Sequence, residues 1–554
     1  MRIRPLVTRL AIPAVAVGLL VSGCSAGTGP GGTADVGTTN DINPQDPATL
    51  KDGGNLRMQI DSFPETFNSL HIDSDADVSQ VLDPLMPSPF TVDAAGQFTV
   101  NHDYFTDVKL TGTDPQQVTY TINPKAVWTD GSLITWEDLQ SEAVALAGAD
   151  KGYQINSPSG FDRVAKVERG TDDRQAIVTF SHPYAEWQGQ FSPLYPKAVT
   201  ATPQAFNDLD RSTLTVSAGP FVISNIDRTQ NRITLGRNPK WWGTPPKLDT
   251  VTFSVLDISA VLGGIQNNEL DYAYMSGLSN VTAARNTPGI VIRRAAQPSY
   301  SVLTFNGANG SILADPKLRL AISKAIDRQA IVNASQHGIV DDPKPLNNHI
   351  FMAGQKGYQD NSAPTAFDPN QAATELDALG WKLNGDTREK DGRKLVLRDV
   401  MYQQDLWVDT AKIIQENLAK VGVKLDIQTF PGQSLFTGVI NPGNFDLAQF
   451  SWSGSALPLG ALEQIYAYYP DNQQGNKGRI GSPELNALID RTLAELDPAK
   501  AIDLANQCDK MIWEEGFSLP LNQASGNYAV RSNLANIGAF GLASADWTKI
   551  GFVQ

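Results

Sequence analysis

The chain has 554 residues, with 59 Asp and Glu against 44 Lys and Arg, and only two cysteines. Its net charge of −15 disfavours nucleic acid and anionic membrane surfaces as partners, because both repel an acidic protein. The length allows two or three domains whose cores are large enough to be stable without disulfides.

The first 23 residues are typical of a secretory signal peptide. Arg2, Arg4 and Arg9 give a positive start, and residues 10–23 form an apolar run that is shorter than the roughly 20 residues needed to span a bilayer. The sequence Val-Ser-Gly-Cys that ends at Cys24 resembles a bacterial lipobox, which implies acylation of Cys24. Two or more acyl chains would anchor the protein in the lipid bilayer, on the extracytoplasmic face of the cell membrane. The alternative is an ordinary secretory peptide with a cysteine by chance.

Residues 24–49 are predicted to form a flexible tether. From Ser25 to Asn40 the chain is nearly all Gly, Ser, Thr, Ala, Pro and Asp, a composition that cannot bury a core. Residues 27–32 match the dinucleotide-binding pattern G-x-G-x-x-G, but no strand precedes them, Pro30 interrupts them and no helix follows. We therefore interpret this match as accidental.

The folded part is expected to begin near Gly53 with a β-strand. Alternating apolar and polar residues predict strands, and two of these flank a polar turn and should form a β-hairpin. The predicted strands cover 55–60, 118–122, 221–223, 232–236 and 251–255, and the turn covers 227–231.

Most of the predicted helices begin at a capping residue, and four of them have Pro at the first helical position. Thr135 and Asp138 form a capping box at the start of the first helix. The predicted helices run over 135–147, 315–338, 368–380 and about 409–422, and two more begin at 482 and 497. A strand over 423–427 follows directly after one of them. Helix, Gly and strand in repetition predict an α/β fold.

The sequence contains no pattern that indicates catalysis or metal binding. The five histidines form no H-E-x-x-H, and G-x-S-x-G and P-loop patterns are missing. Cys508 lies on an apolar helical stripe and is predicted to be a buried, inert thiol. Residues 73–77 resemble the start of a calcium loop, but Val78 and Pro84 stand where Gly and Glu are required. We expect no enzymatic activity, no cofactor and no metal.

Six segments resemble, in order along the chain, the signature blocks of one family. They are Trp128 to Asp138, Ala218 to Gly243, Leu318 to Arg328, Phe367 to Trp381, Phe445 to Trp452 and Phe517 to Leu521. The family is that of the extracytoplasmic solute-binding proteins of ABC importers, in the peptide/nickel-binding branch (family 5). Within this family, the amino-acid sequence of these segments is most similar to that of actinobacterial oligopeptide-binding lipoproteins.

The resemblance implies a two-lobed α/β clamp of the periplasmic-binding-protein type (type II, cluster C) with an extra third domain. Such a clamp, expected to be a monomer, would close on an oligopeptide and deliver it to ABC permease subunits of the inner membrane. The expected division places lobe I at 50–77, 216–298 and 516–554, the extra domain at 78–215, and lobe II at 299–515.

The resemblance also implies how a peptide would be held. A receptor for varied peptides binds the shared backbone by strand addition, and in this family the segment around the Trp of the fifth block supplies the strand. An Asp three residues after that Trp binds the peptide ammonium. Here the Trp is Trp452 and the third residue after it is Ser455, whose hydroxyl cannot neutralise a positive charge. The candidate ligand-binding residues are Phe67, Asn68, Tyr300, Phe305, Asn306, Phe450, Ser451, Trp452, Ser453, Ser455 and Glu463.

Three explanations for Ser455 remain open. Another carboxylate, Glu463 or Glu65, could replace the missing Asp. The ligand could lack a free α-amine, as a blocked peptide, a γ-linked peptide or a non-peptide solute does. The protein could also be a transport-inactive relative that regulates cell-envelope synthesis. A secreted hydrolase is a further class, without motif support.

Overall fold

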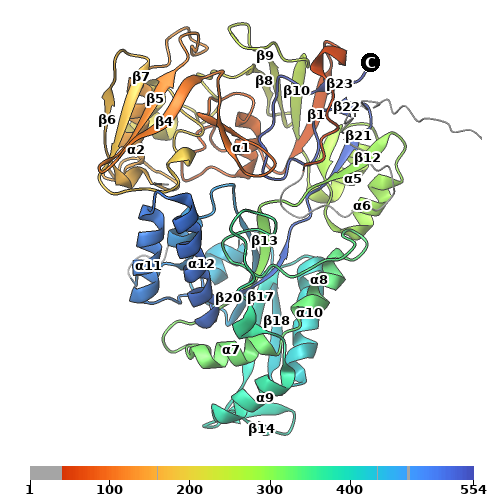
Figure 1. Ribbon diagram of the computed structural model, residues 1–554. Coiled ribbons are helices and arrows are strands. Elements are labelled where there is room, and N and C mark those ends of the chain that lie inside the picture. Colours follow the sequence, from red (N-terminus) through yellow and green to blue (C-terminus); the bar gives the residue numbers. More distant parts are fainter. Residues whose placement is uncertain (1–39, 159, 433, 471–474) are drawn as a thin grey trace, which may run out of the picture.

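The computed structural model describes residues 40–554 except 159, 433 and 471–474. Figure 1 shows an upper half that contains a seven-stranded and a four-stranded sheet, and a lower half that contains a five-stranded sheet. Helices and sheets alternate in both halves, so the α/β prediction is confirmed.

The seven-stranded sheet gathers segments from the start, middle and end of the chain. Its central strand β1 buries Leu56, Met58 and Ile60, the apolar residues of the predicted alternation. The predicted hairpin is formed by β8 and β9. The strand order is β12 (Ile290–Arg294), β21 (Asn527–Arg531), β11 (Tyr272–Tyr274), β1 (Asn55–Ile60), β10 (Thr250–Val255), β9 (Arg232–Arg237) and β8 (Phe221–Asp227).

The four-stranded antiparallel sheet forms the other part of the upper half, with α2 packed against it. The predicted capping box at the start of α2 is present, because the Asp138 carboxylate accepts from the Thr135 N–H. The strand order is β4 (Phe105–Thr113), β5 (Gln116–Ile122), β7 (Gln175–Phe180) and β6 (Val164–Arg169). Two small pairs are β2 (Phe90–Val92) with β3 (Phe98–Val100), and β22 (Leu534–Ala535) with β23 (Gly551–Phe552).

The α-helices of the upper half are α1 (Ala76–Leu82), α2 (Trp136–Leu146), α3 (Lys197–Thr200), α4 (Pro203–Asp208), α5 (Val261–Gln266) and α6 (Gly277–Arg285).

The five-stranded sheet is the centre of the lower half. Its strand order is β18 (Lys424–Phe430), β17 (Val396–Tyr402), β19 (Leu447–Ser453), β13 (Ser299–Phe305) and β20 (Ser518–Gln523). The expected boundary at residue 516 disagrees with this pairing, because β20 was assigned to lobe I and instead hydrogen-bonds to β13. A three-stranded sheet of β14 (Lys382–Asn384), β15 (Thr387–Lys390) and β16 (Arg393–Lys394) lies at the bottom of the view.

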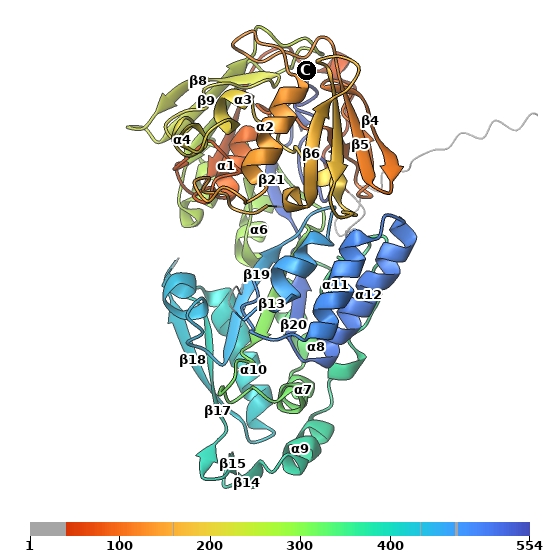
Figure 2. The ribbon, with the colours of Figure 1, turned by 90° about the vertical axis from the view of Figure 1, so that its left-hand side faces the viewer.

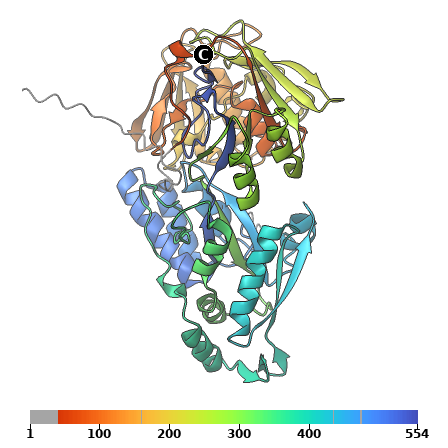
Figure 3. The ribbon, with the colours of Figure 1, turned by 90° about the vertical axis from the view of Figure 1, so that its right-hand side faces the viewer.

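Six helices belong to the lower half. Helices α8 and α10 pack against strands of the five-stranded sheet, whereas α11 and α12 lie below the four-stranded sheet of the upper half (Figures 2 and 3). The helices are α7 (Pro316–Lys324), α8 (Arg328–Gln336), α9 (Pro369–Ala378), α10 (Asp405–Ala419), α11 (Pro483–Ala494) and α12 (Pro498–Glu514).

Two helix predictions were wrong in their extent. The single helix expected over 315–338 is broken into α7 and α8, because the Asp327 carboxylate accepts from the Ala330 N–H and caps a new helix. Helix α10 begins four residues before the expected Asp409, and the early turn buries Trp407 against Tyr402 and Ile427. Cys508 is completely buried on α12, as predicted, and burial raises the pKa of its thiol to about 11.

The chain crosses between the halves in two neighbouring segments, residues 295–298 and 524–526. The Gln297 N–H donates to the Ala524 carbonyl at 2.9 Å, and the Ala524 N–H donates to the Ser299 carbonyl at 2.8 Å. Gly526 has φ +51°, and a Cβ there would lie 2.3 Å from the Ala295 carbonyl oxygen. Only glycine allows these two segments to approach so closely. We call them the crossover pair.

The end of the expected tether is bound to the upper half. Asp41 exchanges two backbone hydrogen bonds with Ala539, at 2.8 and 2.9 Å, and its carboxylate lies 2.6 Å from the Arg293 guanidinium. Leu50 is 3% exposed and pairs with Val553. The prediction of a flexible segment up to residue 49 was therefore wrong for 41–49. Residues 24–39 of the expected tether, including Cys24, lie outside the described residues.

No helix among the described residues combines the length and the apolar character needed to cross a bilayer.

Candidate ligand-binding cleft

A cavity of about 1000 Å³ lies where the upper half meets the end of β19. We call it the main cavity. Its upper wall comes from the segment after α1, from β2 and β3 and from the C-terminal segment, and its lower wall from the residues that follow β19. Representative lining residues are Asp83, Tyr104, Trp241, Ser455, Leu457 and Trp547.

Four smaller cavities adjoin the main cavity, and one of them, of about 190 Å³, shares Ala456 and Leu457 with it and is lined by Lys356. The other three continue the space between the halves. The side cavity of about 410 Å³ shares Asp83 and Trp547 with it, and the lower cavity of about 450 Å³ shares Ser455 and Leu457. The hinge cavity of about 250 Å³ lies at the crossover pair and shares Gly454 with both the main and the lower cavity. Together they form one cleft between the halves, large enough for a ligand of several residues.

The end of β19 has a backbone edge that faces this cleft. Strand β13 pairs with β19 along its whole length, up to Ser299 opposite Ser453. On the other side, the described pairing with β17 covers Leu447 and Ala448. The last residues of β19 thus have a strand on one side, which is the arrangement that strand addition by an extended ligand requires.

Five of the candidate residues line the cleft. Tyr300, Trp452, Ser453 and Glu463 line the lower cavity, and Ser455 lines both the lower and the main cavity. The Tyr300 hydroxyl is 3.1 Å from that of Tyr466. The structure therefore brings together candidates from β13, β19 and the segment around Glu463.

The Ser455 hydroxyl is already engaged by its own loop. It donates to the Leu457 carbonyl and accepts from the Leu457 N–H, both at 3.0 Å. This closes a small turn and leaves the side chain uncharged at the position where the resemblance places an amine partner.

Other candidate residues support the fold and do not line these cavities. Phe67 is completely buried in the main core, and the Asn68 amide donates to the Phe206 carbonyl at 2.9 Å. Phe305 is also a core residue, and the Asn306 amide binds the Phe445 carbonyl at 2.8 Å. Packing and turn hydrogen bonds already use these four side chains, and their role as ligand contacts stays a prediction.

The remaining two candidates lie on β19 away from the cavity lining. Phe450 is 1% exposed and packs edge-on against Trp452, with ring centroids 5.3 Å apart. The exposed Ser451 faces Ser301 across the strands, with 3.4 Å between the hydroxyl oxygens. Phe450 thus fixes the position of Trp452 and does not contact the cleft.

Neither carboxylate suggested as a replacement for the missing Asp is free in the cleft. Glu463 lies 3.6 Å from the Arg163 guanidinium, although desolvation still raises its pKa. Glu65 is exposed and lies outside the lining of the described cavities.

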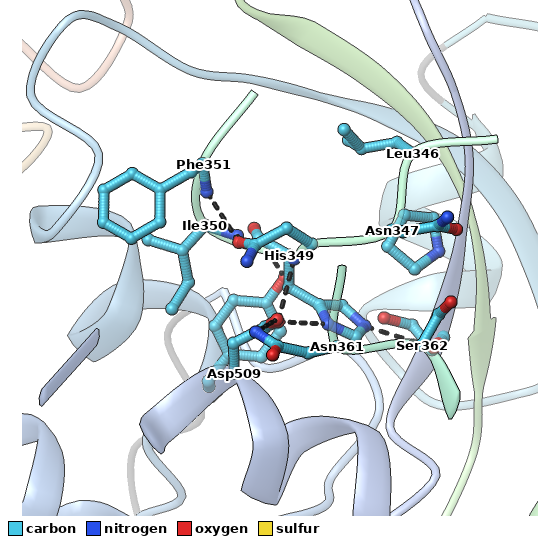
Figure 4. A network of polar contacts seen from close by, with 12 residues as sticks. Leu346, Asn347, His349, Ile350, Phe351, Asn361, Ser362 and Asp509 are labelled. Carbon is cyan, nitrogen blue, oxygen red and sulfur yellow. Dashed lines mark hydrogen bonds and ion pairs between the residues drawn. The ribbon is translucent and has the colours of Figure 1, made fainter. Parts of the chain in front are cut away.

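A buried polar network supports the wall of the lower cavity (Figure 4). His349 Nδ1 lies 2.8 Å from Asp509 Oδ1, and the Asn361 amide donates to Asp509 Oδ2 at 2.7 Å. The His349 carbonyl in turn accepts from the hydroxyls of Tyr300 and Tyr466, at 3.3 and 3.5 Å. The network thereby connects helix α12 to a residue that lines the cleft.

The charged side chains that line the main, side, lower and hinge cavities are carboxylates. The described residues that line these four cavities include no Lys and no Arg. One carboxylate, Asp546, is partly compensated by Lys549 at 2.9 Å. The six carboxylates are Asp83, Asp103, Asp162, Glu186, Glu463 and Asp546. None of the first four belongs to a sequence pattern, so sequence reasoning had no reason to select them.

Within the described residues, no group of three possible ligands is placed to hold a metal ion.

Comparison with known proteins gives a consistent result. Residues 106–476 match the family described as bacterial extracellular solute-binding proteins, family 5 middle. The chain is 53% identical over 557 aligned residues to the oligopeptide-binding protein OppA of Mycobacterium tuberculosis, an alignment that covers 99% of this chain and 93% of OppA. It is 26% identical to the probable monoacyl phosphatidylinositol tetramannoside-binding protein LpqW of the same species, over 64% of this chain and 59% of LpqW.

Solved structures share the fold. The periplasmic EDTA-binding protein EppA superimposes with a TM-score of 0.86 at 24% identity, over 94% of this chain and 99% of EppA. The oligopeptide-binding protein AppA of Bacillus subtilis, solved with a nonapeptide, gives a TM-score of 0.76 at 20% identity, over 91% of this chain and all of AppA. The two-lobed clamp predicted from the sequence is thereby confirmed.

Proposed function

Since the chain belongs to the bacterial extracellular solute-binding proteins of family 5, we propose that it captures oligopeptides in the cleft between its halves and delivers them to an ABC import permease. The observation that carries this proposal is the cleft, in which the main cavity adjoins a lower cavity that is lined by Trp452 and Ser453 at the free edge of β19. The name of the 53% identical mycobacterial relative, an oligopeptide-binding protein, supports it.

The peptide backbone would add to the edge of β19 near Trp452 and Ser453. Strand addition uses main-chain hydrogen bonds, so it accepts many side-chain sequences. Tyr300 and Trp452 would then form the apolar wall beside the peptide. Closure of the upper half on the lower half would occur by bending at the crossover pair.

We also propose that Cys24 is acylated and holds the protein on the extracytoplasmic face of the cell membrane as a monomer. The lipobox resemblance at Cys24 supports the anchor. Such an anchor would keep the receptor near its permease.

Two of the alternatives have less support from the cleft. A regulatory relative without a ligand is favoured by a cleft filled with the protein's own side chains, whereas the main cavity measures about 1000 Å³. A polyanionic solute such as EDTA, named for one structural neighbour, is disfavoured because the lining charges are carboxylates. A blocked or γ-linked peptide remains an alternative ligand.

Native mass spectrometry of the protein purified from its host, without its signal peptide, tests the proposal. We expect a bound peptide, or a family of peptides, to be released on denaturation. A protein that carries no peptide and gains no thermal stability from any peptide pool would contradict it.

A further inference from the structure

We propose that Asp83, on the upper wall of the main cavity, binds a positively charged ammonium group of the ligand and replaces the amine partner that is missing at Ser455. This inference rests on the proposed peptide-binding function. It assigns the cleft to cationic ligands and places their charge on the upper half of the clamp.

The location of Asp83 is the first argument. It follows the last residue of α1, and it lines both the main and the side cavity. Its side chain is exposed to this internal space, although protein surrounds it, and the resulting desolvation raises the pKa of the carboxyl. Ser455 lines the same main cavity from the lower half. A ligand that fills the main cavity therefore contacts both walls, with Asp83 on the upper one and Ser455 on the lower one.

The hydrogen bonding of Asp83 is the second argument. The Trp547 indole N–H donates to Asp83 Oδ2 at 2.6 Å and fixes the direction of the carboxylate. This donor is neutral, and Asp83 forms no ion pair within the described part of the chain. A carboxylate at the C-terminal end of a helix also meets the negative end of the helix dipole. Both features leave an unbalanced negative charge that a bound cation would neutralise.

Four of the rival carboxylates are compensated or misplaced, whereas Asp162 lines the lower cavity without an ion pair among the described residues and does not line the main cavity with Asp83. Glu463 has Arg163 as a partner, Asp546 has Lys549, and Glu65 lies outside the lining. Glu186 accepts two backbone N–H groups, from Leu459 and Gly460. Asp103 lies on the same cavity with its pKa raised by desolvation, and it adds to the negative potential.

The lining also predicts what the cleft does not bind. A ligand carboxylate held in a cleft needs a cation or several N–H donors. The described lining of the main, side, lower and hinge cavities supplies no Lys or Arg, and Lys356 lines only the adjoining cavity of about 190 Å³. We therefore expect the C-terminal carboxylate of the peptide to be unimportant for affinity.

The test compares four versions of one random pentapeptide pool without basic side chains. They carry a free N-terminus, an acetylated N-terminus, an acetylated N-terminus with one Lys added, or a free N-terminus with a C-terminal amide. Dissociation constants are measured by calorimetry for the wild type and for Asp83→Asn, Glu463→Gln and Trp547→Phe.

For the wild type, we expect acetylation to weaken binding about 30-fold or more, and amidation to change it little. Recovery of binding by the added Lys would show that a side-chain cation serves as well as the terminal amine. Failure of Lys to recover binding would assign the site to the terminal amine alone. Asp83→Asn should lose the preference for a free amine, and Trp547→Phe should reduce it, because the carboxylate loses the donor that fixes its direction. Glu463→Gln should keep the preference. Thermal melts establish that each variant is folded, and the amide introduced by Asp83→Asn still offers an oxygen that can accept from the Trp547 indole.

Two results would overturn the inference while the peptide-binding function stands. One is equal affinity of the wild type for free and acetylated pools, and the other is loss of the amine preference in Glu463→Gln with retention in Asp83→Asn. If no version of the pool binds to the wild type, the proposed function fails and the inference fails with it.

Discussion

The carboxylate of Glu186, on the upper half, accepts a hydrogen bond from the backbone N–H of Leu459, on the lower half, at 2.6 Å. The next residue, Gly460, donates to the other carboxylate oxygen at 2.7 Å. Nearby, the Ala185 N–H donates to the Leu493 carbonyl at 2.7 Å. The halves are thus joined at a second place besides the crossover pair, and the contact includes a buried titratable group.

Glu186 should make closure depend on pH. Desolvation raises its pKa from 4.5 to about 7 in this contact. The form that contains this contact therefore binds a proton more tightly than a form in which Glu186 is hydrated, and its stability falls as the pH rises through about 7. We expect the contact to form on closure. The difference in pKa corresponds to about 3 kcal/mol, fully present below about pH 4.5. We expect ligand affinity, measured by calorimetry, to be higher at pH 5.5 than at pH 8.

Glu186→Gln isolates this effect from other titrating groups. The amide stays neutral, so affinity should vary less with pH than in the wild type. An equal pH dependence in the wild type and the variant would show that Glu186 does not control closure.

Asp399→Asn should stabilise the lower half at high pH. Asp399, a residue of β17, is completely buried, and the amide of Gln449 on β19 donates to it at 2.6 Å. Desolvation nevertheless raises the pKa of Asp399 to about 7. An ionised Asp399 is therefore costly above pH 7, and a neutral amide of the same shape removes the cost. Urea unfolding at pH 8 should show a gain of about 2–4 kcal/mol, and at pH 5 a much smaller one. An equal change at both pH values would contradict this account.

Asp509→Asn should weaken the wall of the lower cavity. The substitution disturbs a fully buried carboxylate that binds both His349 and Asn361, so the free energy of unfolding should fall by about 3 kcal/mol. Because the His349 carbonyl positions the hydroxyl of Tyr300, ligand affinity should fall as well. The matched control is Asp503→Asn, an exposed position on the same helix, for which we expect little change.

Gly526→Ala should strain the crossover pair. The backbone of Gly526 is left-handed, with φ +51°, and the added Cβ would lie 2.3 Å from the Ala295 carbonyl oxygen. We expect a loss of about 1–3 kcal/mol in denaturant unfolding, together with a changed affinity for ligand. Gly263→Ala is the control, because a Cβ at that helical position has nothing within 4 Å and should be neutral or stabilising. Similar losses in both variants would argue against a special role for Gly526.

The local elements were largely predictable from the sequence. Alternation identified β1 and β10, and the pairs Asp368-Pro369 and Ser482-Pro483 marked the starts of α9 and α11. These features depend on residues that are neighbours along the chain. Asp327 was missed as a helix start because the apolar stripe continues past it, and its contact with Asn417, which is distant in the sequence, adds to the local cap on Ala330 in favouring a break.

The site was predictable only in part, for a related reason. Trp452 and Ser455 were found through a motif, whereas Asp83 is a single carboxylate after a short helix and belongs to no pattern. Its importance depends on Trp547, which is distant in the sequence and donates to it. Phe305 and Asn306 also come from a motif, and the structure shows that packing and a turn hydrogen bond use their side chains.

The attachment of Asp41 to Ala539 and Arg293 joins the N-terminal end of the described chain to the upper half. A tether that leaves the body at Asp41 pulls on the upper half alone, and the lower half is connected to it through the crossover pair. If the N-terminal segment holds the protein at a surface, the upper half keeps its position relative to that surface. The lower half is then the part that moves when the cleft closes. The permease would therefore sense closure as a change in the distance of the lower half from the membrane.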